Sequence, residues 1–384
     1  MPWNETCTMN ERNKLIDAWL SREFNITQLS ERFKVSRKTI YKWLGRYDLY
    51  GREGLVDVSR APINTPHKTP TEIRDQIVRL KHRFPYWGPM KLNDYLRLNY
   101  PDVNWPATST MGEILKVSGL VKRKKRRHKV PPHSQPLRHA DEPNKVWSAD
   151  FKGQFKLGND KVCYPLTLTD NYSRYLLACD ALPGLKLSGV RPVYERLFRE
   201  FGLPDAIRTD NGYPFAQVCL GGLSPLSIWL LRLGILPERI DKGCPQQNGR
   251  HERMHRTLKQ ETVNPAAITM RAQQRAFDQF VADYNNERPH QSLSGMTPAS
   301  VYHASLRPFP EVLPDVEYPS EWQVRKVKCA GQIKLFSNPI YVSRQLIGEY
   351  VGLKPVGNAV WQIYYCRLPM GIIDERIGRV TRPS

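Results

Sequence analysis

Apolar and polar positions in the first 50 residues follow a helical period. They predict helices over residues 13–23, 26–33 and 37–44. Ser36 directly precedes the third segment and can cap it, because its hydroxyl can accept a hydrogen bond from a backbone N–H of the first turn. The apolar face expected for the first helix consists of Leu15, Ile16, Trp19 and Leu20. Three short helices joined by tight turns predict a small helical bundle.

The third of these helices would carry a basic outer face. In a helix-turn-helix the third helix enters the major groove of DNA, so its outward side chains are candidate DNA contacts. These are Arg37, Lys38, Thr39, Tyr41 and Lys42. Lys34 stands at the turn position where glycine is usual. A plain three-helix bundle with solvated basic residues is the alternative interpretation.

A second helical unit follows a proline-rich stretch at residues 59–69. Its expected helices span residues 72–84, 91–98 and 108–118. Gly119 suits the C-terminal cap of the last helix. Thr108 and Ser109, at the start of that helix, are candidate DNA contacts.

The densest run of charge comes directly after this unit. Its basic members are Lys122, Arg123, Lys124, Lys125, Arg126, Arg127 and Lys129. A run this dense cannot pack, so we expect a solvated linker that tracks DNA phosphates without reading sequence. A nuclear localisation signal is the alternative interpretation.

Beyond residue 140 the pattern alternates between strand and helix, as in an α/β domain. The expected strands are residues 146–157, 164–170, 174–181, 206–209 and 235–240. The expected helices are residues 189–201, 224–233, 248–261 and 271–286. After a proline-rich linker, residues 320–384 hold short β-prone runs separated by Gly, Asn and Pro, which predict a small β-barrel.

The balance of charge indicates what these units bind. The 384 residues carry a formal net charge of +21, and +14 of it lies in residues 1–140, where 27 Lys and Arg face 13 Asp and Glu. This asymmetry favours a polyanionic partner over a merely solvated surface. No run of 18 apolar residues, lipidation signal or secretory leader is present, so we expect a soluble chain with no membrane partner. Seven scattered cysteines predict reduced thiols in a cytosol.

Three short phrases in the α/β region each contain an acidic residue. They are Val-Trp-Ser-Ala-Asp150, Arg-Thr-Asp210-Asn-Gly and Asn-Gly-Arg-His-Glu252. Asp150 lies in an apolar, strand-like run, Asp210 ends a short one, and Glu252 begins a run without helix breakers. Two Mg²⁺ ions about 3.5–4 Å apart need oxygen ligands from separate segments, and carboxylates suit them. The phrases therefore predict a nuclease-like metal site.

These phrases resemble the signature of the DDE transposases and retroviral integrases. The acids lie 60 and 42 residues apart, within the words Trp-x-x-Asp, Thr-Asp-Asn-Gly and Asn-Gly-x-x-Glu. A later phrase, Tyr284-Asn285-x-x-Arg288-Pro289-His290-Gln291-Ser292-Leu293, resembles the end of that core in bacterial insertion-sequence transposases. The last gap is longer than in integrases, which leaves Glu238 and Glu261 as alternative third ligands.

The resemblance implies a ribonuclease-H-like core in which Asp150 and Asp210 lie on adjacent strands and Glu252 faces them from a helix. These three would be the catalytic residues and hold two Mg²⁺ ions, with Mn²⁺ able to substitute. The resemblance also implies a second helix-turn-helix before the core. It further implies a C-terminal barrel that binds DNA or a neighbouring subunit, with a purely structural cap as the alternative.

The helix that begins at Glu252 would carry further contacts. Glu252, Arg256 and Lys259 follow at i, i+4 and i+7 and share one helix face. We expect Arg256 and Lys259 to hold the phosphates of the DNA end; an ion pair on a solvated helix is the alternative. His251 points to another face and is expected to be a DNA contact or plain surface.

As a whole, the chain is expected to be a multidomain α+β protein. Its predicted parts are a helix-turn-helix domain at residues 1–58, a second such domain at 59–120, a basic linker at 121–140, the integrase-like core at 141–305, a linker at 306–319 and the small β-barrel at 320–384.

The function implied is that of a transposase acting on double-stranded DNA in a bacterial cytoplasm, at the nucleoid. It would bind the terminal inverted repeats of a mobile element, cleave at the 3′ ends and join the freed 3′-OH to target DNA. Two ends must meet, so we expect a homodimer or higher oligomer on DNA. A catalytically silent DNA-binding regulator and a ribonuclease-H-like nuclease without strand transfer are the alternatives.

Overall fold

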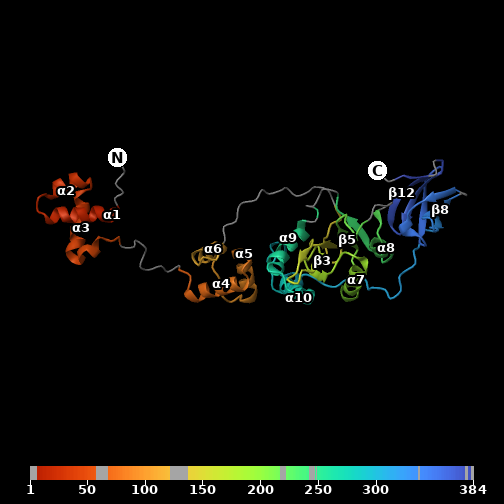
Figure 1. Ribbon diagram of the computed structural model, residues 1–384, viewed down its shortest axis with the longest axis horizontal. Helices are drawn as coiled ribbons and strands as arrows, with labels where there is room; N and C mark the ends of the chain where they lie inside the picture. The colour runs from red at the N-terminus through yellow and green to blue at the C-terminus, as the bar shows by residue number, and fades with distance from the viewer. Residues whose placement is uncertain are drawn as a thin grey trace. The chain divides into compact units, whose positions relative to one another are not determined.

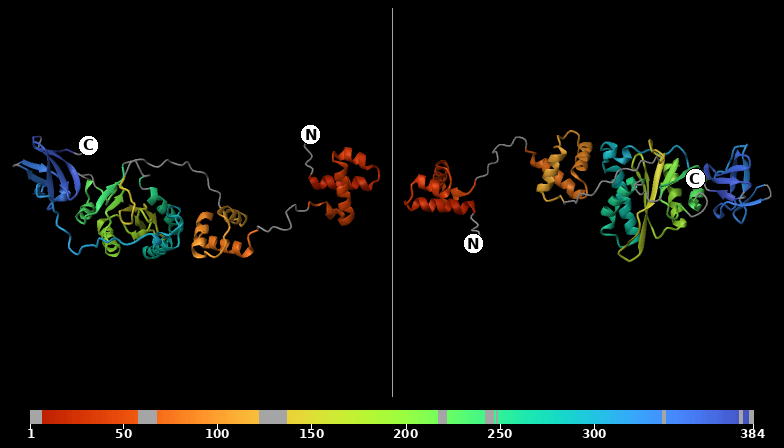
Figure 2. Two further views of the ribbon diagram at one scale, coloured as in Figure 1. Left: turned by 180° about the vertical axis from the view of Figure 1, so that it is seen from behind. Right: turned by 90° about the horizontal axis from the view of Figure 1, so that it is seen from above.

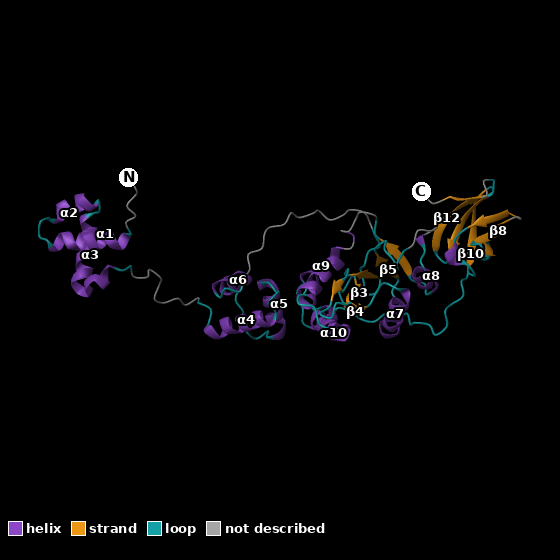
Figure 3. Ribbon diagram, viewed as in Figure 1, coloured by secondary structure: helices purple, strands orange, loops and turns teal. Residues whose placement is uncertain are grey.

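The computed structural model describes most of the chain (Figure 1). The described residues are 7–57, 68–121, 137–216, 222–241, 247, 249–335, 338–376 and 379–381. The basic run at residues 122–129 therefore lies outside the described part. The chain divides into two compact units, Met1–Lys68 and Thr69–Ser384. Helices make up the described part of the first unit, and the last part of the second unit is mainly strands (Figure 3).

The first unit is a bundle of three helices around one apolar core. The elements are α1 (Thr8–Leu20), α2 (Ile26–Phe33), α3 (Arg37–Tyr50) and a 3-10 turn, η1 (Gly51–Leu55). Leu15 and Ile16 are buried as predicted. Trp19 and Leu20 are 37% and 52% exposed, so their predicted core position is wrong. They lie in the last turn of α1, beyond the part that packs against α2 and α3.

The turn between α2 and α3 has the geometry of a helix-turn-helix turn without its usual glycine. Lys34 takes the left-handed conformation, with φ of 52°, and its N–H bonds back to the end of α2. Ser36 caps α3 as predicted, because its side chain accepts a hydrogen bond from the N–H of Thr39. This cap satisfies a backbone donor that would otherwise have no partner in the first turn.

The second unit begins with three more helices, α4 (Thr71–Arg83), α5 (Pro89–Asn99) and α6 (Thr108–Val117). They pack around an apolar cluster that includes Trp87, Trp105 and Met111. Gly119 follows α6 with φ of +71°, a conformation that glycine adopts without strain. The predicted cap glycine is confirmed at this position.

The α/β part of the second unit is built on one mixed sheet. Its strands are β1 (Val146–Phe151), β2 (Phe155–Lys156), β3 (Val162–Asp170), β4 (Leu176–Leu182), β5 (Ala206–Thr209) and β6 (Leu236–Arg239). Their order is β2-β3-β1-β5-β6, with β4 also on β3. β1, β5 and β6 run parallel, while β3 runs antiparallel to β1 and β4. The strand expected over residues 146–157 is two strands, separated by Gly153 at φ of +86°.

Helices cover both faces of this sheet. α7 (Leu187–Phe201) and α8 (Pro225–Arg232) pack on one face, and α9 (Gly249–Leu258) and α10 (Met270–Asn286) pack on the other (Figure 2). Side chains alternate along each strand, so odd positions of β3 point towards α9 while Leu166 and Leu168 point towards α7. A π-helical turn, Lys259–Val263, continues α9, and 3-10 turns occur at Gln291–Leu293, Pro298–Ser300 and Arg344–Leu346.

The C-terminal part consists of two sheets around a shared apolar core. β7 (Gln323–Lys326), β10 (Tyr350–Gly357), β11 (Val360–Tyr365), β12 (Leu368–Asp374) and β13 (Arg379–Thr381) form one sheet, and β8 (Gln332–Leu335) and β9 (Asn338–Tyr341) form the other. Among the described residues β7 and β13 remain at the sheet edges, so the structure does not confirm a closed barrel. In the described part of the chain no helix has both the length and the apolarity to cross a lipid bilayer.

Candidate catalytic site

The first two predicted acids lie on neighbouring parallel strands. β1 and β5 pair in register through Ser148 and Arg208. Two residues further along, Asp150 directly follows the buried part of β1, and Asp210 directly follows the last residue of β5. The two carboxylates therefore leave the same edge of the sheet, which is the arrangement that the family resemblance implies.

The turn after Asp210 explains why Asn211 and Gly212 follow it in the sequence. The backbone N–H of Gly212 donates a hydrogen bond of 3.0 Å to Oδ1 of Asp210. A Cβ at position 212 would lie 3.1 Å from Oδ2 of Asp210, which is closer than side chains normally pack. Asn211 donates from Nδ2 to the carbonyl of Ile240, which ties the turn to the chain after β6. Glycine thus leaves room for the carboxylate, and the turn holds it in place.

Glu252 lies in the first turn of α9 and is exposed. The two alternative third ligands are both occupied elsewhere. Glu238 forms an ion pair of 2.6 Å with Arg208, and Glu261 forms one of 2.9 Å with Arg288. Within the described residues, Glu252 has no ion pair.

The charges of the other two acids act on Asp150. Burial and, next, the negative charge of Asp210 raise the pKa of Asp150 to about 7, with a smaller contribution from Glu252. No lysine or arginine nitrogen of the described residues lies within 4.0 Å of these three carboxylates. In a chain with a net charge of +21, an unpaired acidic group at one edge of a sheet suits a cation.

A buried pair of histidines lies behind Asp150. His251 and His255 are 1% and 5% exposed, one turn apart on the inner face of α9. Both bond through Nε2 to the hydroxyl of Thr167, at 2.7 and 2.6 Å, and Nδ1 of His251 lies 2.9 Å from the hydroxyl of Thr169. Burial lowers the pKa of His251 to about 3 and that of His255 to about 2, so both rings are neutral. The expectation that His251 contacts DNA or lies on the surface is wrong.

The donor set fits a divalent metal ion. Carboxylate oxygens of Asp150, Asp210 and Glu252 are the ligands that Mg²⁺ and Mn²⁺ prefer. Ligand atoms of Asp150, His251 and His255 also lie within 4.8 Å of one another. His251 is not available as a ligand, because both of its ring nitrogens have threonine partners.

The candidate DNA contacts of the first unit lie mostly on its surface. Arg37, Lys38, Tyr41 and Lys42 are exposed along α3. Thr39 is half-buried, and its hydroxyl is bonded to that of Ser36 at 2.9 Å. Thr39 thus serves the cap in this structure, while the other four side chains face solvent.

The remaining candidate DNA contacts also differ in their exposure to solvent. Ser109 is exposed, but the hydroxyl of Thr108 accepts a hydrogen bond from Asn93 and is half-buried. Arg256 is exposed on α9. Lys259 is exposed but begins the π-helical turn, so the i+7 spacing from Glu252 does not follow one regular α-helical face. Lys122, Arg123, Lys124, Lys125, Arg126, Arg127 and Lys129 lie outside the described residues.

The later phrase, which begins at Tyr284, supports the fold of the core. The side chain of Asn285 accepts a bond of 2.8 Å from the N–H of Leu176 and donates one of 2.9 Å to its carbonyl. Asn285 thereby fastens the end of α10 to the start of β4. Asp170 opens a turn between β3 and β4, because its carboxylate accepts bonds from the N–H and hydroxyl of Ser173.

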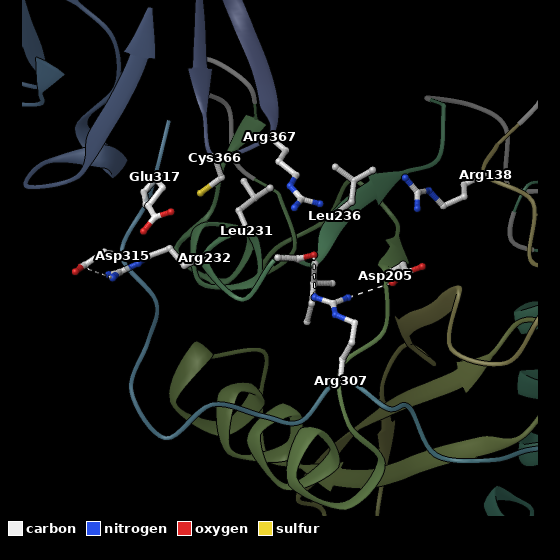
Figure 4. A pocket seen from close by; sticks show the side chains of 13 residues that line it. Arg138, Asp205, Leu231, Arg232, Leu236, Arg307, Asp315, Glu317, Cys366 and Arg367 are labelled. Atoms are coloured by element: carbon white, nitrogen blue, oxygen red, sulfur yellow. Dashed lines mark hydrogen bonds and ion pairs between the residues drawn. The ribbon is translucent and has the colours of Figure 1, made fainter. Parts of the chain in front are cut away.

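A cavity beside α8 and β6 is lined by none of the three acids (Figure 4). It measures about 730 Å³ and is lined by charged residues that largely pair with one another. Arg307 binds Asp205 and the carbonyl of Pro204, and Arg232 pairs with Asp315 and Glu349. These pairs attach the chain that follows the core to α8. Asp150, Asp210 and Glu252 do not line this cavity.

Models of known families match the α/β core and the helices that precede it. Residues 140–245 and 233–298 match the family described as Integrase core domain. Residues 11–63 match Helix-turn-helix domain, and residues 39–115 match Homeodomain-like domain.

Curated relatives come from mobile elements. An uncharacterized 39.2 kDa protein of insertion element IS476 from Xanthomonas euvesicatoria is 29% identical over 244 residues, which are 62% of this chain and 66% of that protein, just under two thirds of its length. An uncharacterized 31.7 kDa protein of insertion element IS407 from Burkholderia multivorans is 27% identical, over 64% of this chain and 87% of that protein. The Gag-Pol polyprotein of Koala retrovirus is 28% identical over 55% of this chain and 12% of that protein.

Solved structures show a weaker likeness. The HTLV-2 integrase catalytic core domain in complex with magnesium covers 43% of this chain and all of that one, at 15% identity and a TM-score of 0.35. The simian T-cell lymphotropic virus intasome in complex with a PP2A regulatory subunit covers 76% of this chain and 97% of that one, at 19% identity and a TM-score of 0.37. Scores this low carry no argument about this chain. The family matches and the insertion-element relatives agree with the resemblance: the chain carries helix-turn-helix matches ahead of an integrase core domain match and is similar to proteins of bacterial insertion elements.

Proposed function

We propose that this chain is a DDE transposase that cleaves a mobile element at its 3′ ends and joins the freed 3′-OH to target DNA. The observation that carries the proposal is the acidic trio. Asp150 and Asp210 share one sheet edge, and the charge of Glu252 on α9 raises the pKa of Asp150. None of the three has a lysine or arginine nitrogen within 4.0 Å in the described part of the chain.

Asp150, Asp210 and Glu252 would hold two Mg²⁺ ions, with Mn²⁺ able to substitute. Such a pair supplies an activated water, or binds the 3′-OH, and stabilises the leaving oxygen of an in-line displacement. The chain's own residues position these groups. β1 and β5 fix the separation of the two Asp carboxylates, and Gly212 leaves space for that of Asp210.

Basic residues would bind the DNA around this site. Arg256 and Lys259 are exposed close to Glu252 in sequence and would hold phosphates of the DNA end. The run at residues 122–129 would track the backbone without reading sequence. No serine or tyrosine nucleophile is required, because the attacking group is water or the DNA's own 3′-OH.

Sequence recognition would belong to the helix-turn-helix domains. The exposed face of α3, with Arg37, Lys38, Tyr41 and Lys42, would enter the major groove of the terminal inverted repeat. Thr39 and Thr108 would reach DNA only if their present hydrogen bonds were given up, whereas Ser109 is exposed. The C-terminal sheets would contact DNA or the neighbouring subunit.

Two element ends must be joined in one reaction, so we propose a homodimer or higher oligomer on double-stranded DNA. The protein would work at the nucleoid of a bacterial cell. Its proposed ligands are DNA and divalent cations. The excess of basic residues suits DNA, which is a polyanion.

Incubation of the full chain with labelled element ends, Mg²⁺ and a plasmid tests the proposal. A transposase joins the labelled ends to the plasmid. Intact ends would indicate a DNA-binding regulator, and cut but unjoined ends would indicate a nuclease; either result would overturn the proposed strand transfer.

A further inference from the structure

The hydroxyl of Thr167 determines where the protons lie in the buried histidine network. Its Oγ1 donates to the backbone carbonyl of Asp150 at 3.1 Å and also contacts Nε2 of His251 and of His255. A hydroxyl has one proton and can accept two hydrogen bonds. Because the proton goes to the carbonyl, both imidazoles must donate from Nε2.

This tautomer leaves the two rings in different situations. Nδ1 of His251 is then an acceptor, and the hydroxyl of Thr169 at 2.9 Å supplies a proton to it. Nδ1 of His255 is also an acceptor, but no hydrogen bond reaches it from any described residue. It lies 3.7 Å from Oδ2 of Asp150, which is another acceptor whenever that carboxyl is ionised. A nearly buried lone pair thus faces a carboxylate, an unfavourable arrangement that a cation between them would relieve.

We propose that Nδ1 of His255 is a ligand of the metal ion held by Asp150, so that this ion has mixed nitrogen and oxygen ligands. The inference rests on the proposed metal-dependent function of the acidic trio. Neutral imidazole is the form that binds metals, and it suits first-row ions such as Mn²⁺ better than Mg²⁺. The site should therefore favour Mn²⁺ over Mg²⁺ more strongly than an all-carboxylate site does.

His251 provides a matched control on the same helix. It is as buried as His255, bonds to the same threonine and differs in having no nitrogen left for a metal. Glutamine can place its amide near the Nε2 position, so His255→Gln can keep the bond to Thr167 while removing Nδ1. The substitution His251→Gln makes the same chemical change without touching the proposed ligand.

Pulsed electron paramagnetic resonance of the untagged full chain with one equivalent of Mn²⁺ tests the ligand directly. We expect ¹⁴N modulation from a coordinated imidazole in the wild type and in His251→Gln, and its loss in His255→Gln. It should also be lost in Asp150→Asn, which identifies the site. Persistence of the nitrogen signal in His255→Gln, or its absence from the wild type, would overturn the proposal.

Affinity gives a second readout that does not depend on activity. Removing one ligand should weaken Mn²⁺ binding in His255→Gln roughly tenfold or more, with a smaller change for Mg²⁺. Thermal melting of each variant reports whether it folds. If His255→Gln does not fold, labelling the wild type with ¹⁵N-histidine should convert the ¹⁴N modulation to that of ¹⁵N; an unchanged signal would contradict histidine ligation.

Failure of this proposal can be told from failure of the proposed function. Strand transfer by a wild type without nitrogen coupling would leave the transposase intact and remove the His255 ligand. Nitrogen coupling in a chain that does not transfer strands would support the ligand and remove the transposase.

Discussion

Helix α3 of the first unit and the sheet edge of the core both carry charged side chains that form no ion pair with a lysine, arginine or carboxylate of the described residues, but of opposite sign. Arg37, Lys38 and Lys42 on α3 form no ion pair within the described residues, whereas other basic residues of the unit do, such as Arg12 with Asp57. In the core, Asp150, Asp210 and Glu252 lack basic partners, while Glu238 and Glu261 have them.

Such a difference marks where a protein meets its ligands. Folding pairs charges where it can, because an unpaired charge in a partly buried place is costly. Basic side chains left free on an exposed helix suit a polyanion, and carboxylates left free at a sheet edge suit a cation. The proposed DNA recognition and the proposed phosphoryl transfer thus belong to separate parts of the chain, and each can be tested separately.

The largest expected effect concerns the third acid. Glu252→Gln should reduce strand transfer by roughly 10³-fold or more, because the side chain keeps its size but loses the charge that holds a metal ion. Glu261→Gln is the matched control and should retain far more activity, since Glu261 already pairs with Arg288. A gel-based strand-transfer assay measures both variants. Loss of activity in Glu261→Gln with a working Glu252→Gln would reverse the assignment.

The opposite side of the comparison is tested by removing charge from α3. Arg37→Ala with Lys38→Ala should weaken binding to the element end by roughly 30-fold or more, since two lost contacts at about 1–3 kcal/mol each amount to about 2–6 kcal/mol. Metal binding by the core should not change. Fluorescence anisotropy with labelled element ends measures the affinity. Unchanged end binding would show that α3 is not the recognition helix.

The raised pKa of Asp150 predicts a pH-dependent cost in the metal-free protein. A carboxyl whose folded pKa is about 7, above its usual 3.8, stabilises the fold only while it is protonated. The loss begins above the unfolded pKa and is complete above about pH 7. Asp150→Asn should therefore stabilise the metal-free chain at pH 8 by a few kcal/mol, on the order of the shift. Urea unfolding with chelator at pH 8 and pH 4 tests this, and an equal effect at both pH values would contradict it.

The smallest effect concerns the cap of the recognition helix. Ser36→Ala removes the side-chain acceptor of the Thr39 N–H and should destabilise the first unit by about 1 kcal/mol. Thermal unfolding monitored by circular dichroism measures the change. End binding should weaken only as far as α3 frays, and catalysis on pre-cut ends at saturating DNA should be preserved.

Local sequence signals predicted much of this structure. The bounds of α2 and β5 agree with expectation, and so does the Ser36 cap. These features depend on neighbouring residues, such as an acceptor one position before a helix. Placement of Asp150 and Asp210 on adjacent strands came from the family resemblance rather than from periodicity.

Long-range packing accounts for the rest. The stripe His251, Met254, His255 and Leu258 has the i, i+3, i+4, i+7 spacing of a buried helix face, which was a usable signal. Nothing local shows that threonines of β3, more than 80 residues earlier, satisfy those rings. The exposure of Trp19 and the break of the first core strand at Gly153 likewise depend on tertiary contacts or backbone conformation.

The central claim is that one acidic site performs the chemistry while separate domains recognise DNA. Asp150→Asn on pre-cut element ends tests it most directly, because pre-cutting removes the need for cleavage. With anisotropy and strand transfer measured on the same preparation, we predict end binding close to wild type and joining reduced to background. Robust joining of pre-cut ends by Asp150→Asn would contradict the claim.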